Sequence, residues 1–178
     1  MKLVKLFVSI IICQIAATIG AFFTTPEINS WYKYLKKPFF NPPNWIFAPV
    51  WTILFVLMGV SLYLVWIKEW EPHDLSLNKK IKAWNPISQK LWTGSWKKAN
   101  IVLIFALQLF INVLWSVIFF GMHSPVAGFF VILMLWMAIL FTIMNFYRVS
   151  KTAAWLLVPY ILWVSFAGVL NLFIFILN

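Results

Sequence analysis

The sequence predicts an all-α membrane protein: a bundle of five transmembrane helices with a long first loop, rich in proline and aromatic residues, acting as a lid. Of its 178 residues, 63% are hydrophobic and 10% charged, whereas a globular domain has about 45–50% and about 25%. The charged residues, apart from Lys5, lie outside five apolar runs. Each run reaches the roughly 20 residues that cross a bilayer as a helix. We therefore expect a single membrane domain over residues 1–178.

The first apolar run, residues 4–24, is expected to be a transmembrane helix. A signal peptide is the alternative, but the run is long for one and no small-x-small cleavage site follows it before Pro26. Cys13 lies within the run and is expected to be a buried structural residue. Small residues recur four apart, as in Ala16 and Gly20, which predicts close packing of this helix within the bundle or in a homodimer.

The first loop, residues 25–45, contains four prolines, three of them in its second half, together with many aromatic side chains. X-Pro bonds restrict the chain to extended or turn geometry, so this segment is not a flexible linker. We interpret it as a lid across one end of the bundle. An interfacial aromatic belt is the alternative interpretation.

The remaining apolar runs predict four more helices, over residues 46–67, 99–120, 125–147 and 153–177. None shows the two-residue alternation of a β-barrel strand. Pro49 and Pro125 suit first helical turns, and Pro159 is expected to kink the last helix. Residues 68–98 form an inserted polar and basic loop, expected to be solvated and near lipid headgroups.

The net charge of +10 is explained by topology. Three basic residues, Lys33, Lys36 and Lys37, lie in the first loop, and the other 11 of the 14 lie at the amino end, in residues 68–98 and before the last helix. The positive-inside rule then places the amino end in the cytoplasm and the carboxyl end outside, in a multi-pass protein of the cytoplasmic membrane. A nucleic-acid partner is not expected.

Three predicted helices carry aromatic stripes with few hydrogen-bonding groups. Trp51 and Phe55 share a face of the second helix, and Asn112 and Trp115 share a face of the third. The stripe on the fifth consists of Tyr160, Trp163, Phe166, Ala167, Leu170 and Asn171. This composition favours a pocket for a planar, mostly apolar molecule. Ordinary helix packing, held by buried amides, is the alternative.

Catalytic patterns are missing from the predicted helices. No carboxylate pair, metal-ligand cluster or Ser/His dyad is present, so no catalytic residue and no metal site are predicted. His73 and His123 fall in loops and are not expected to ligate haem iron. The absence of an ionisable side chain deep in a helix also argues against a proton-coupled pump.

Three segments resemble signatures of the TspO/MBR family, the tryptophan-rich sensory protein and translocator protein family. The first is WYKYLKKPFFNPPNW followed by PVW, over residues 31–45 and 49–51. The second is NVLWSVIFFG, over residues 112–121, and the third is AAWLLVPYILW with the FA and LN pairs that follow, over residues 153–171. The likeness covers nearly the whole chain. Residues 68–98 depart from it, being longer than the usual connection, and no basic residue follows Lys151 where the family's sterol motif requires one.

The resemblance implies a five-helix bundle, commonly dimeric, that binds tetrapyrroles such as protoporphyrin IX and haem as ligands, with no obligatory cofactor. The positions that match the family's pocket and lid are Tyr32, Pro42, Pro43, Trp51, Phe55, Asn112, Trp115, Trp163, Phe166, Ala167 and Leu170. The expected function is a membrane receptor or sensor involved in porphyrin handling or stress regulation. Transport of porphyrins or other small amphiphiles, and light- or oxidant-dependent porphyrin degradation, are the alternatives.

Overall fold

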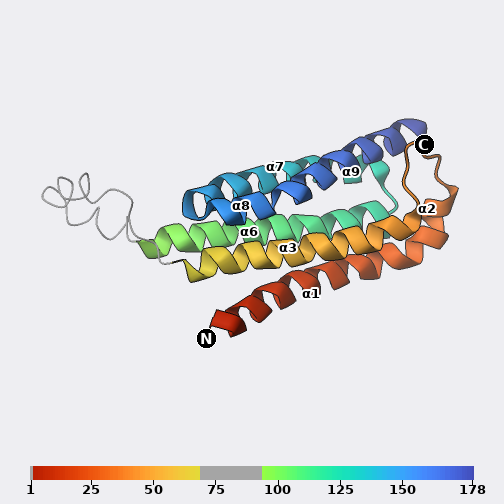
Figure 1. Cartoon of the computed structure of the whole chain (residues 1–178). Coiled ribbons are helices and arrows are strands. Elements are labelled where there is room, and N and C mark those ends of the chain that lie inside the picture. The colour runs from red at the N-terminus through yellow and green to blue at the C-terminus, as the bar shows by residue number, and fades with distance from the viewer. Residues whose placement is uncertain (1, 69–93) are drawn as a thin grey trace, which may run out of the picture.

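The computed structural model describes residues 2–68 and 94–178, with side chains described for 2–68 and 100–178. The described chain is helical, and five of its helical spans are long and apolar enough to cross a membrane. They run side by side as one elongated bundle (Figure 1). The elements are α1 (Lys2–Asn29), α2 (Trp31–Tyr34), η1 (Asn44–Ile46), α3 (Phe47–Ile67), α6 (Gly94–Ser116), η2 (Val117–Gly121), α7 (Pro125–Val149), α8 (Lys151–Leu156) and α9 (Val158–Leu177).

The first helix is longer than the sequence predicts, so the expected loop of residues 25–45 is shorter. α1 continues through Pro26 to Asn29, and the short helix α2 follows at Trp31. The apolar run ends near residue 24, but a helix can extend into the polar zone beyond it. There Ser30 Oγ donates to the carbonyl of Pro26 over 3.1 Å and to Glu27 Oε2 over 2.7 Å. Most of the remaining loop, residues 35–43, is non-helical.

The last membrane span is interrupted where the sequence predicts a kink. α8 ends at Leu156 and α9 begins at Val158, with Pro159 in its first turn. Pro has no N–H to donate, so the first turn of a helix is where its ring costs least. Pro125 likewise begins α7, where Ser124 Oγ caps the helix by accepting from the backbone N–H of Ala127 at 3.3 Å.

Small residues of the first two spans allow close helix packing. A Cβ placed on Gly59 of α3 would lie 2.6 Å from the Cα of Ile10, and one on Gly20 of α1 would lie 3.2 Å from Ser116 Oγ. α1 therefore packs against both α3 and α6 within the bundle. Cys13 is fully buried in this packing, as expected.

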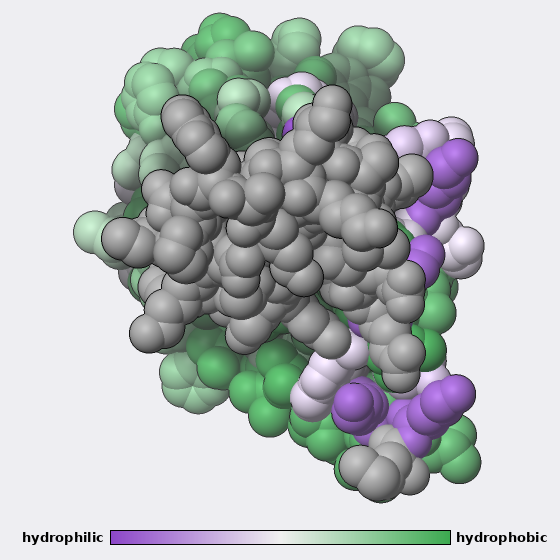
Figure 2. Space-filling model, turned by 90° about the vertical axis from the view of Figure 1, so that its left-hand side faces the viewer, coloured by the Kyte–Doolittle hydropathy of each residue, from purple (hydrophilic) through white to green (hydrophobic). Residues whose placement is uncertain are grey.

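The outer surface fits an integral multi-pass membrane protein. Viewed from the end where α1 begins, hydrophilic side chains form separate patches beside hydrophobic flanks (Figure 2). The two termini lie at opposite ends of the bundle (Figure 1). The basic residues Lys2, Lys5, Lys68, Arg148 and Lys151 all stand at helix ends on one side. Most of the predicted basic loop of residues 68–98, namely residues 69–93, lies outside the described residues.

Candidate functional site

A cavity of about 310 Å³ lies within the half of the bundle away from the amino terminus. It is surrounded by α1, α2, η1, α3, α6, η2 and α9. Its wall is mainly apolar and aromatic, with hydroxyl and amide groups at intervals. Such a composition is typical of small-molecule sites, whose volumes are about 300–1,000 Å³.

The aromatic walls come from α3 and α9. Trp51 contacts Phe55 with ring centroids 5.9 Å apart and meets Tyr160 edge-on at 6.3 Å. One turn further along the same two helices, the ring of Trp163 on α9 contacts Phe47 on α3 at 6.0 Å. Indole and phenyl rings keep few rotamers once packed in this way, so the walls are pre-organised to accept a flat ring system.

The amide stripe of α6 joins the helices around the cavity. Asn112 Nδ2 donates to the hydroxyl of Tyr160 at 2.7 Å, and Trp115 Nε1 donates to Asn171 Oδ1 at 3.3 Å. Asn171 in turn donates to the carbonyl of Pro125 at 3.0 Å, which links α6, α9 and α7. Asn112 and Asn171 therefore do both: they hold helices together, as in the alternative interpretation, and they line the cavity.

One polar group of the cavity-lining residues, the indole Nε1 of Trp163, is buried without a hydrogen-bond partner among the described residues. A second polar side chain of the lining, Asn112, donates its amide nitrogen to the hydroxyl of Tyr160. The Trp163 N–H has almost no accessible surface, so in this conformation it is a buried donor beside the cavity and not a contact already open to a ligand. An unmet buried donor of this kind is costly.

α2 and residues 35–43 lie at one end of the cavity, where Tyr32 and Asn44 line it, and are named the covering segment after their expected role. Tyr32 lines the cavity, is 4% exposed, and donates its hydroxyl hydrogen to Asn41 Oδ1 at 2.9 Å. Burial raises the pKa of Tyr32 to about 12. Lys37 lies with its Nζ 4.5 Å from the centroid of the Tyr32 ring, and partial burial lowers the pKa of this ammonium group.

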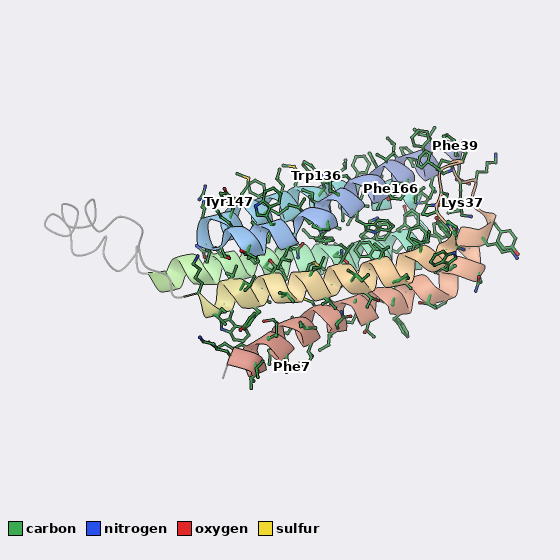
Figure 3. All side chains as sticks on the ribbon, in the orientation of Figure 1. Phe7, Lys37, Phe39, Trp136, Tyr147 and Phe166 are labelled. Atoms are coloured by element: carbon green, nitrogen blue, oxygen red, sulfur yellow. The ribbon has the colours of Figure 1, made fainter. Side chains whose placement is uncertain are left out.

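The same segment is fastened to the end of α9. Asn178 makes a reciprocal pair with the backbone of Lys36, accepting from its N–H at 2.9 Å and donating to its carbonyl at 3.0 Å. Phe40 packs edge-on against Phe166 and Phe173, with centroid distances of 6.4 and 5.2 Å. Phe39 and Lys37 mark this end of the bundle in Figure 3, and Tyr147 and Phe7 lie toward the other end.

The structure brings eight of the eleven sequence-predicted site residues together around the cavity. They are Tyr32, Trp51, Phe55, Asn112, Trp115, Trp163, Ala167 and Leu170. Phe166 does not line the cavity: it lies behind Trp163, with ring centroids 5.5 Å apart, and contacts the covering segment. Pro42 and Pro43 also lie outside the lining and precede η1.

Sequence reasoning missed the wall that α1 contributes. The residues of α1 that line the cavity are Gln14, Ala17, Thr18, Gly20, Ala21, Thr24, Thr25 and Ile28. Their signal is present in the sequence: small and hydroxyl side chains recur every three or four residues. That pattern is also typical of plain helix contact, so it does not by itself distinguish a cavity wall from an interface.

The cavity wall consists of apolar, aromatic, hydroxyl and amide side chains. Among the described residues that line it, none is acidic, basic or histidine. Within residues 2–68 and 94–178, no group of three or more His, Cys, Asp or Glu side chains is placed to hold a metal ion. The lining also lacks His, Cys and Met, the side chains that most often ligate haem iron.

Fold and site together define a polytopic membrane protein with an aromatic-lined cavity inside a five-span bundle. The family model described as "TspO/MBR family" matches residues 9–177, and the chain belongs to this family. It is 36% identical over 178 residues to the tryptophan-rich protein TspO of Archaeoglobus fulgidus, covering 100% of this chain and 99% of the relative. It is 41% identical over 180 residues to the protein of that name in Chlorobaculum tepidum, covering 99% and 98%. The translocator protein of Bos taurus is 33% identical over 154 residues, covering 86% and 78%.

Proposed function

We propose that this protein is a membrane receptor or sensor that binds a tetrapyrrole in the aromatic cavity, as part of porphyrin handling or stress regulation. The observation that carries the proposal is the cavity wall, in which the indoles of Trp51, Trp115 and Trp163 are combined with few polar groups, among them the amide of Asn112. A porphyrin presents a flat, mostly apolar ring with carboxylates at its edge. Those features match aromatic walls that carry few polar groups.

The lining also decides how a metalloporphyrin would be held. Because no His, Cys or Met faces the cavity, and the hydroxyl of Tyr32 is engaged with Asn41, no side chain there is positioned as an axial iron ligand. Affinity therefore comes from ring contacts and hydrogen bonds. We expect protoporphyrin IX and haem to bind with affinities within about tenfold of one another, a difference of about 1.4 kcal/mol.

The test is a titration of the purified protein with protoporphyrin IX, read by Trp quenching and by the ligand's own absorption band. Saturable binding is expected, weakened in Trp51→Ala and in Asn112→Ala. Matched controls are Trp155→Ala, whose side chain is 67% exposed outside the cavity, and Asn145→Ala, whose amide bonds only to its own helix. Lack of saturable binding, or equal effects in site and control variants, would count against the cavity as the binding site.

Transport is the second candidate function, because relatives of this chain are named translocator proteins. Uptake of protoporphyrin IX into proteoliposomes distinguishes it from binding alone. Degradation of the bound porphyrin is tested on the same samples by product analysis after illumination. An absorption spectrum that changes no faster than in the protein-free control would end that interpretation.

The membrane arrangement and assembly belong to the same proposal. The positions of the basic residues favour an amino end in the cytoplasm of a cytoplasmic membrane. Reporter fusions at the two termini test this, and equal signals from both would contradict it because the described spans are odd in number. The expected homodimer is tested by native mass spectrometry of the detergent-solubilised protein.

A further inference from the structure

Among the described lining residues of the cavity, the exposed ones gather on one flank. The lining residues of α6, η2 and α9 are all buried or half-buried. The exposed lining residues belong instead to α1 and to the segment that leads into α3: Thr18, Ala21, Thr25, Asn44, Ala48 and Thr52. α1 and α3 run side by side along one edge of the bundle (Figure 1). The opening therefore lies between these two helices.

The opening lies at the depth of the bilayer. Its neighbours on α1 are strongly exposed apolar side chains, Ile15, Ile19 and Phe22, and on α3 the neighbour is Ile53. Such side chains belong against lipid in a transmembrane span. From Thr18 to Thr25 the opening extends over about 10 Å of helix, at 1.5 Å per residue. The part beside Thr18 and Ala21 lies within the apolar run of α1 and faces hydrocarbon, and Thr25 lies at the polar boundary where that run ends.

The opening ends at a defined point on the side of the amino terminus of α1. Gln14 Nε2 of α1 donates to the carbonyl of Thr52 of α3 at 3.4 Å, which bridges the two helices. Further toward the amino terminus of α1 the two helices are in backbone contact, since a Cβ on Gly59 would lie 2.6 Å from the Cα of Ile10. α1 and α3 are thus held together on the amino-terminal side and separated by the cavity on the other.

The side chains at the opening suit passage of a flat amphiphile. They are small and uncharged, so nothing large has to move. The hydroxyl of Thr18 donates to the carbonyl of Gln14 at 2.9 Å, and that of Thr52 to the carbonyl of Ala48 at 2.8 Å. These hydroxyls are therefore satisfied by their own helices, and a molecule that passes breaks no hydrogen bond between helices.

The covering segment at the other end of the cavity is held in place by hydrogen bonds. Tyr32 bonds to Asn41, and Asn178 fastens the backbone of Lys36 to α9. We propose that the ligand reaches the cavity sideways from the bilayer, through the opening between α1 and α3, and not through the covered end. The ligand class is a planar amphiphile that partitions into lipid. The inference rests on the proposed function in so far as protoporphyrin IX serves as the probe.

Binding kinetics in lipid nanodiscs test the proposal. Protoporphyrin IX is mixed with the full-length protein by stopped flow, and association and dissociation rate constants are measured for Ala21→Trp and Ala48→Trp, which narrow the opening from either side. Both rate constants are expected to fall together by about tenfold, because a barrier on the path slows entry and exit equally. The fall in the association rate constant is the readout of the barrier, because both residues also line the cavity and a larger side chain there can alter the dissociation constant. Ile19→Trp, on the lipid face of α1, is the matched control and should behave as wild type.

Asn178→Ala separates the two routes. It releases the covering segment and should leave both rate constants within about twofold of wild type if the ligand enters from the bilayer. The proposal is overturned if Asn178→Ala accelerates exchange while the two Trp variants do not slow it. It is also overturned if the Trp variants raise only the dissociation rate constant, since that is loss of a cavity contact. Absence of binding by the wild-type protein would instead refute the proposed function.

Discussion

Asn171 is expected to be a central stabilising side chain, because it connects three spans. Replacing it with alanine removes the acceptor of Trp115 Nε1 and the donor to the Pro125 carbonyl. A net contribution of about 1 kcal/mol for each hydrogen bond gives a loss of about 2 kcal/mol. The smaller average of about 0.6 kcal/mol for bonds between membrane helices would give about 1.2 kcal/mol. We therefore expect Asn171→Ala to lower the free energy of unfolding by about 1–2 kcal/mol.

The assay is reversible unfolding by sodium dodecyl sulfate in mixed micelles, followed by circular dichroism. Asn145→Ala is the matched control, because the Asn145 amide donates only to the carbonyl of Phe141 in its own helix, at 2.7 Å. Its expected effect is within about 0.5 kcal/mol of zero. The reasoning is refuted if the two variants lose the same stability. A second readout is protoporphyrin affinity, which should fall in Asn171→Ala because Trp115 loses the bond that orients its indole.

Three further predictions concern packing, titration and accessibility. Gly59→Ala should destabilise the protein in the same unfolding assay, because the added Cβ would lie 2.6 Å from backbone of α1, whereas Gly168→Ala, with its nearest atom at 3.8 Å, should be tolerated. Burial raises the pKa of Tyr32 to about 12, above the unfolded value of about 10. The stabilisation that depends on a neutral Tyr32 is therefore complete below pH 10 and is lost as the pH rises towards 12. The thermal unfolding temperature should fall across that interval, and Tyr32→Phe should reduce the fall. Cys13, which is fully buried, should react with a maleimide only after unfolding, and rapid labelling of the folded protein would contradict its placement.

The first loop shows where sequence reasoning stopped. Hydropathy falls after residue 24, and Pro26 suggests a helix end, yet α1 continues to Asn29. Hydropathy measures the transfer of side chains into lipid, and it does not report whether the backbone remains helical in the polar zone beyond. The position of residues 35–43 also depends on contacts that are distant in sequence, such as the pair between Asn178 and Lys36. No local pattern encodes that pair.

The cavity was predicted in part for a similar reason. Trp51, Asn112 and Trp163 stand on faces that periodicity can identify, because the 3.6-residue repeat decides which side chains share a side of a helix. The contribution of Thr18 and Ala21 could not be identified in this way. Small residues on a helix either allow close contact or leave space, and only the separation between neighbouring helices decides which.

The sequence by itself determined the membrane environment, the five spans and the aromatic faces of three of them. These follow from local composition and helical period. A bilayer requires about 20 apolar residues per span, and it requires each backbone N–H and C=O to be hydrogen-bonded within the protein. Tertiary structure decided where the helices touch and where they part. α1 meets α3 in close contact at Gly59, whereas further along the two helices line the cavity with residues such as Ala21 and Ala48, and this difference arises from packing between segments distant in sequence.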